Sequence, residues 1–155
     1  MGMKRAVGLL TLALAVVACG DSGTEPPDND VSGDTYALST FAGSSLPLTQ
    51  MAGAECEFGT GPDVELELQA AALTFGPATF LMDWTIRGRC TDTAGEPVGE
   101  WVDLSYSTTG AYTLDGDELM LDDPGAYGTW TGTAGGSELT LTTANSTVTV
   151  WTLQN

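Results

Sequence analysis

From Asp34 onward, apolar and polar side chains alternate with a period of two, and short turn motifs interrupt the alternation. Successive side chains of a β-strand point to opposite faces, so this pattern predicts strands with one buried face. The expected strands cover about 34–41, 46–51, 54–58, 63–75, 78–90, 99–106, 110–115, 118–121, 126–133, 137–143 and 146–154. Only the segment 65–73 (ELELQAAAL) offers a rival helix, and its apolar residues also alternate as in a strand.

Short Gly-, Asn- and Asp-containing turns separate most of these segments. Examples are Gly76-Pro77, Asp115-Gly116-Asp117, Gly135-Gly136 and Ala144-Asn145-Ser146. Short hairpin loops of this kind join antiparallel neighbours. The sequence therefore predicts an all-β fold, a small antiparallel up-and-down barrel of about 8–10 short strands, with a β-sandwich as the alternative.

The composition excludes several classes of function. The chain has no histidine, which removes Ser-His-Asp and Cys-His catalysis and the commonest metal ligand. Its formal charge is −17, so it repels nucleic acid. No nucleophile motif stands out, and we expect no enzyme, no catalytic residues, no cofactor and no metal site. The acidic turns at 115–118 and 122–123 lack the spacing of an EF-hand calcium loop.

The N-terminus has the pattern of an export signal. Lys4 and Arg5 precede an uncharged run over residues 6–18 (AVGLLTLALAVVA). A membrane-spanning helix needs about 20 apolar residues, whereas a signal peptide needs only 7–15. We therefore expect residues 1–18 to be a cleaved signal peptide.

The run ends in Val16-Val17-Ala18-Cys19, which resembles the lipobox of bacterial lipoproteins at all four positions. The resemblance implies that Cys19 is the lipidation site: its thiol receives a diacylglyceryl group, cleavage follows Ala18, and the new amino group takes a fatty acid such as palmitate. Two or three acyl chains give a durable membrane anchor. By the same resemblance, Gly20 rather than Asp after the cysteine favours an outer-membrane lipoprotein of the cell envelope, facing the periplasm.

The mature chain divides into a tether and a domain. Residues 19–33 consist of the lipidated cysteine and an acidic stretch rich in Gly, Ser, Pro and Asn, which predicts a flexible tether reaching roughly 20 Å. Residues 34–155 form the expected barrel-like domain. Its arrangement of strands and turns, from Tyr36-Ala37-Leu38 to Leu139-Thr140-Leu141-Thr142, resembles the small lipocalin-like domains of bacterial lipoproteins.

Two cysteines, Cys56 and Cys90, remain after the lipidation site is assigned. An even pair in an oxidising compartment predicts a structural disulfide. Free thiols and a redox-active pair are the alternatives, although a redox pair usually has the shorter Cys-x-x-Cys spacing.

The side chains of segment 79–90 alternate between two faces of the expected strand. Phe80, Met82, Trp84, Ile86, Gly88 and Cys90 are expected to point inward, and Arg87 and Arg89 outward. The two arginines are the only cations of the mature chain. They can pair across strands with Glu65, Glu67 or Glu100, or they can contact an anionic ligand.

The four tryptophans, Trp84, Trp101, Trp130 and Trp151, lie in or beside expected strands. They either fill the core or line an apolar ligand cavity. The leading hypothesis for function is a membrane-anchored, non-catalytic binding module for a small apolar ligand or a periplasmic partner. The alternative is a structural or interaction lipoprotein with a packed core and no small ligand.

Overall fold

The computed structural model describes residues 30–122 and 128–155. The expected signal peptide, Cys19 and tether residues 20–29 lie outside the described residues. The described chain forms strands and turns, and it includes no helix long and apolar enough to cross a membrane. The strands are β1 (Thr35–Phe41), β2 (Ser44–Ser45), β3 (Leu48–Met51), β4 (Asp63–Phe75), β5 (Thr79–Thr91), β6 (Pro97–Asp103), β7 (Tyr106–Asp115), β8 (Glu118–Asp122), β9 (Thr129–Ala134), β10 (Glu138–Thr142) and β11 (Val148–Leu153).

Eight antiparallel strands close into a barrel in the order β1-β11-β10-β9-β8-β7-β5-β4. The closing contact joins β1 to β4, with Thr35 opposite Thr74 and Ala37 opposite Ala72. The predicted antiparallel barrel is confirmed and the sandwich is not formed. The rival helix at 65–73 is part of β4, as its alternation indicated.

The barrel interior is filled by side chains. Trp130, Trp151, Tyr36, Phe75 and Phe80 are each at most 2 % exposed. Leucines from β4, β8 and β10 complete the same cluster. Apolar burial at roughly 25 cal/mol per Å² is the main stabilising contribution of this core.

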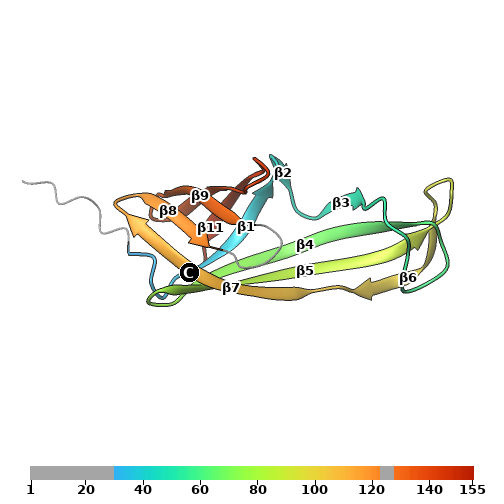
Figure 1. Ribbon diagram of the computed structural model, residues 1–155, viewed down its shortest axis with the longest axis horizontal. Coiled ribbons are helices and arrows are strands. Elements are labelled where there is room, and N and C mark those ends of the chain that lie inside the picture. The colour runs from blue at the N-terminus through green and yellow to red at the C-terminus, as the bar shows by residue number, and fades with distance from the viewer. Residues whose placement is uncertain (1–29, 123–127) are drawn as a thin grey trace, which may run out of the picture.

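Strands β4 and β5 have thirteen residues each and run beyond the barrel. Their outer parts, Asp63–Leu68 and Ile86–Thr91, are flanked by β3 on one side and β6 on the other. We call this four-stranded sheet the extension. Figure 1 shows it projecting to one side of the barrel, while the chain enters the barrel at the opposite end.

Three expected strands differ in the structure. The segment 54–58 is a loop rather than a strand, because Gly53 adopts a positive φ of 60° and Cys56 is bonded to β5. The expected strands 99–106 and 110–115 are replaced by β6 and β7, which meet at Leu104-Ser105. There Asp103 Oδ1 accepts a hydrogen bond from the Ser105 amide (2.9 Å), a local turn that moves the chain between the two strands.

The domain begins slightly before the first strand. Val31, in the stretch expected to be tether, is 2 % exposed and belongs to the core cluster. The amide of Gly33 donates to the carbonyl of Phe75 at 2.9 Å. Residues 31–33 therefore pack against the barrel.

Candidate functional site

An apolar hollow lies where the barrel meets the extension. Strand β1 pairs with β4 only as far as Ala37, and β3 takes its place beside β4 from Leu68 to Glu65. A bulge in β4 between Leu68 and Ala70 marks the change of partner. The side chains of Phe41, Leu48, Gln50, Leu66, Leu68, Trp84 and Ile86 line the resulting hollow.

The hollow has a volume of about 120 Å³. Pockets for whole drug-sized ligands measure roughly 300–1,000 Å³, whereas a dry cavity of about 150 Å³ holds benzene. The hollow therefore has room for one ring or a short branched alkyl group. Six of its seven lining residues are apolar, so it favours an apolar occupant.

Trp84 separates the hollow from the barrel core. Its ring lies 6.2 Å from the rings of both Trp130 and Trp151, and 6.5 Å from Phe41. The Trp151 indole donates a hydrogen bond to Thr149 Oγ1 (2.9 Å), and that hydroxyl donates to the Leu141 carbonyl (3.2 Å). This cluster fills the barrel end, so three of the four tryptophans have the core-filling role.

The extension has an apolar face that continues the barrel interior. Cross-strand partners share a face, so Leu48 and Leu68 lie on the same side as Ile86. Phe58, from the loop after Cys56, covers part of this face, because a Cβ at Gly88 would lie 3.1 Å from its ring and 2.6 Å from Leu104. Phe58 remains 37 % exposed. Part of the apolar face is therefore accessible to solvent.

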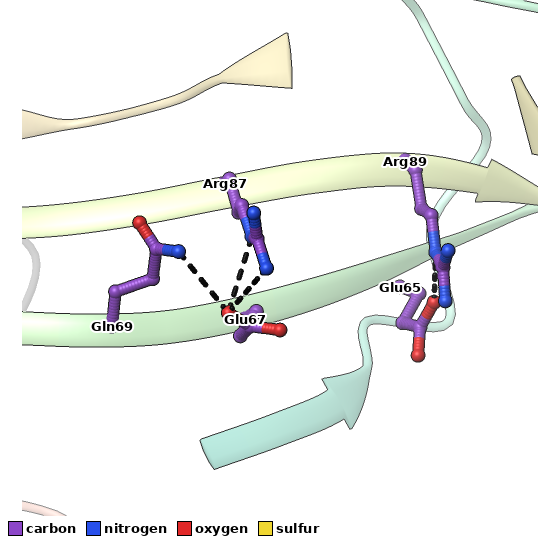
Figure 2. A network of polar contacts seen from close by, with 5 residues as sticks. All are labelled: Glu65, Glu67, Gln69, Arg87 and Arg89. Carbon is purple, nitrogen blue, oxygen red and sulfur yellow. Dashed lines mark hydrogen bonds and ion pairs between the residues drawn. The ribbon is translucent and has the colours of Figure 1, made fainter. Parts of the chain in front are cut away.

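The opposite face of the extension is charged. Arg87 pairs with Glu67 at 2.9 Å, and Arg89 pairs with Glu65 (Figure 2). Cross-strand pairing of the arginines, one of the two alternatives from the sequence, is therefore present. Of the three acidic candidates, Glu65 and Glu67 are the partners that form ion pairs.

Trp101 supports this charged face from β6. The guanidinium carbons of Arg87 and Arg89 lie 4.5 and 4.3 Å from the centre of its ring. Cation–π contacts of this kind contribute about 0.5–1 kcal/mol at exposed sites. The fourth tryptophan thus orders the two arginines outside the core, a role that the sequence analysis did not predict.

Cys56 and Cys90 form a disulfide, as expected, with their Cα atoms 5.6 Å apart. Both residues are buried, at 9 % and 3 % exposure, and they pack with Val64 and Leu66 in a small cluster. The bond ties the loop that carries Phe58 to the end of β5. Its position indicates a structural role in holding the extension together.

The acidic turn at 115–118 connects β7 to β8. Across residues 30–122 and 128–155, no group of three or more Cys, Asp or Glu side chains is placed to hold a metal ion. Asp123, part of the second acidic cluster, lies outside these ranges.

Tyr36 is a buried polar group at the other end of the barrel. Its hydroxyl donates to the carbonyl of Gly136 at 3.0 Å and lies 3.4 Å from Asp34 Oδ2. Burial, followed by the negative charge of Asp34, raises the pKa of Tyr36 to about 12. The group is therefore a neutral hydrogen-bond donor at physiological pH, and it ties β1 to the turn before β10.

The hollow was not predicted as a site from the sequence. Ile86 was expected to point inward, and the alternation over residues 65–73 predicted a strand, but neither observation shows that β4 and β5 extend beyond the barrel. The length of the two alternating runs, thirteen residues each, was the available signal.

Comparison with known proteins gives no match to this chain, either among protein-family models, among curated proteins or among solved structures.

Proposed function

We propose that this protein is a lipid-anchored, non-catalytic binding protein of the cell envelope, and that the hollow beside Trp84 receives one apolar group of its partner. The observation that carries the proposal is the hollow itself. It is lined mostly by apolar side chains, measures about 120 Å³ and opens on the part of the sheet that lies outside the barrel.

The filled barrel argues against a carrier of whole lipids. In a ligand-carrying barrel of the lipocalin type, the interior holds the ligand. Here the rings of Trp130 and Trp151 occupy that space and are at most 1 % exposed. A protein partner that inserts a single side chain fits the volume better. The alternative, a packed structural lipoprotein with no apolar ligand, is favoured by the same filled core and opposed by the hollow.

Attachment through Cys19, in the outer membrane and facing the periplasm, belongs to the same proposal. Its support is the lipobox at residues 16–19 and the preceding uncharged run. The chain enters the barrel at the end away from the extension (Figure 1). An anchored protein would thus present the extension away from the lipid surface.

The anchor is tested by replacing the lipidation site. Cys19→Ala should move the protein from the membrane fraction to the soluble fraction of fractionated cells. Cys56→Ser is the matched control, because it removes a cysteine without a role in anchoring and should leave the protein in the membrane. Unchanged membrane association of Cys19→Ala would refute the anchor.

The hollow is tested with a neutral solvatochromic dye, which avoids repulsion by the acidic protein. The wild-type protein should shift the emission of the dye to shorter wavelength. Leu48→Glu places a carboxylate in the hollow and should weaken dye binding at least tenfold. Leu81→Glu is the control, because Leu81 is 38 % exposed on the barrel wall, away from the hollow. Equal binding by both variants, or none by the wild type, contradicts the proposal.

A further inference from the structure

The β3 strand is an open edge of the extension. Its pairing within the described chain is with β4 alone, and β3 ends the strand order of the sheet. Thr49, Gln50 and Met51 are all exposed, and Met51 reaches 50 %. Exposed edges present unpaired N–H and C=O groups, on which another chain can pair.

The hydrogen-bond pattern shows which groups are free. The amide of Ala52 donates to the carbonyl of Val64 at 2.8 Å, so residues 52 and 64 form a hydrogen-bonded pair. Such pairs alternate along an antiparallel ladder, which makes Gln50 and Leu48 the next residues bonded to β4. The N–H and C=O groups of Thr49 and Met51 therefore point away from β4, toward solvent.

The other edge of the extension is protected. Strand β6 contains Pro97, which has no N–H, and the charged residues Glu100 and Asp103. Its pairing with β5 is also interrupted by a bulge between Gly88 and Cys90. Proline, charge and bulges are the usual devices that prevent edge pairing. Strand β3 (LTQM) has none of them.

The open edge and the hollow are adjacent. Leu48 and Gln50 belong to β3 and also line the hollow. A strand added beside Thr49 and Met51 would direct every second side chain to the apolar face of the extension. One apolar side chain of such a strand would then lie against the hollow.

We propose that the extension binds an extended, basic segment of a partner protein, which adds to β3 as a further strand and places one apolar side chain at the hollow. This inference rests on the proposed function and specifies its partner. Main-chain hydrogen bonds supply affinity and the hollow supplies specificity in this mode of recognition. The charge of −17 favours a basic segment and opposes pairing of β3 with β3 of a second copy.

The test uses the full lipoprotein in neutral detergent and two synthetic peptides of equal composition. One peptide alternates lysine with leucine and valine, and the other has the same residues in an order without alternation. The alternating peptide should bind at least tenfold more tightly, and the amides of Thr49 and Met51 should exchange more slowly with solvent in the complex. Equal binding of the two peptides overturns the inference.

Met51→Pro removes one outward N–H and leaves the hydrogen bonds to β4 intact. It should therefore weaken binding of the alternating peptide at least tenfold, while binding of the dye persists. Glu100→Pro, on the other edge, is the matched control and should bind as the wild type does. If Met51→Pro disturbs the circular dichroism spectrum, Thr49→Lys serves instead, because its charge repels the basic peptide.

The outcomes separate the two proposals. Dye binding without selective peptide binding refutes strand addition but is consistent with an apolar site. Absence of both dye binding and selective peptide binding refutes both proposals. A wild-type dimer in sedimentation that Met51→Pro converts to a monomer would assign the edge to a second copy and overturn the partner proposed here.

Discussion

Strands β4 and β5 belong to two different structures along their length. Over Ala71–Phe75 and Thr79–Trp84 they are barrel wall, with neighbours on both sides and a filled interior behind them. Over Asp63–Leu68 and Ile86–Thr91 they are the middle of an open sheet. The same alternation of side chains continues through both parts, and only the covering of the apolar face changes.

This difference shows how one hairpin can belong to a closed core at one end and to an open sheet at the other. The barrel buries Tyr36, Phe75, Phe80, Trp130 and Trp151 almost completely and leaves no open edge along the barrel parts of β4 and β5. The extension keeps an apolar face that is partly exposed, a disulfide and a pair of salt bridges. An open sheet of this size has little hydrophobic core of its own, so the disulfide and the salt bridges contribute a larger share of its stability.

The largest effect is expected from removing a ring in the barrel. Trp151→Ala, at a residue with 0 % exposure, should lower the free energy of unfolding by about 3–5 kcal/mol. Trp101→Ala in the extension removes two cation–π contacts at a partly exposed ring and should cost about 1–2 kcal/mol. Urea denaturation measures both. Similar losses of unfolding free energy for the two variants would mean that the barrel and the extension do not differ in how much their tryptophans stabilise the fold.

The next largest effect concerns the disulfide. Cys56→Ser with Cys90→Ser opens a loop with a sequence separation of 34, which corresponds to about 3–4 kcal/mol in the chain-entropy model. The loss should be local: hydrogen exchange at residues 63–68 and 86–91 should accelerate by about 100-fold or more. Amides of β8 and β10 should change little. Uniform acceleration would show that the extension unfolds only together with the barrel.

A smaller effect is expected from matched glycine substitutions. In Gly132→Ala, the new Cβ would overlap the backbone of Thr140, which cannot move without breaking the ladder; the loss should be about 1–3 kcal/mol. In Gly88→Ala the nearest atoms are the ends of the Leu104 and Phe58 side chains, which can shift. In thermal melts, Gly88→Ala should therefore have a higher melting temperature than Gly132→Ala. A lower melting temperature for Gly88→Ala would mean that the side chains of Leu104 and Phe58 cannot shift.

The smallest effect appears only in alkali. Because the pKa of Tyr36 is raised from 10.0 to about 12, the folded state holds the proton more tightly than the unfolded state does. The resulting stability is complete below pH 10 and is lost as the pH rises from 10 to 12. The melting temperature should fall over this range in the wild type and less in Tyr36→Phe. An equal fall in both proteins would assign the alkaline loss to other groups.

The sequence predicted the barrel because period-two alternation reports directly on a buried face. It also predicted the inward set from Phe80 to Cys90 and the disulfide, and it named Glu65 and Glu67 among three possible partners of the arginines. It could not identify the hollow, because alternation is the same whether the neighbour of β4 is β1 or β3. Which strand leaves the barrel depends on contacts between residues far apart in the chain, such as Ala37 with Ala72.

The position of β1 has a mechanical consequence. Tension applied at Val31 acts first on the packed residues 31–33 and then on β1, which is bonded on one side to β4 and on the other to β11. Both neighbours must release it before the strand can peel away. A load applied there would thus be shared by two ladders at the seam of the barrel, at the end opposite the extension (Figure 1).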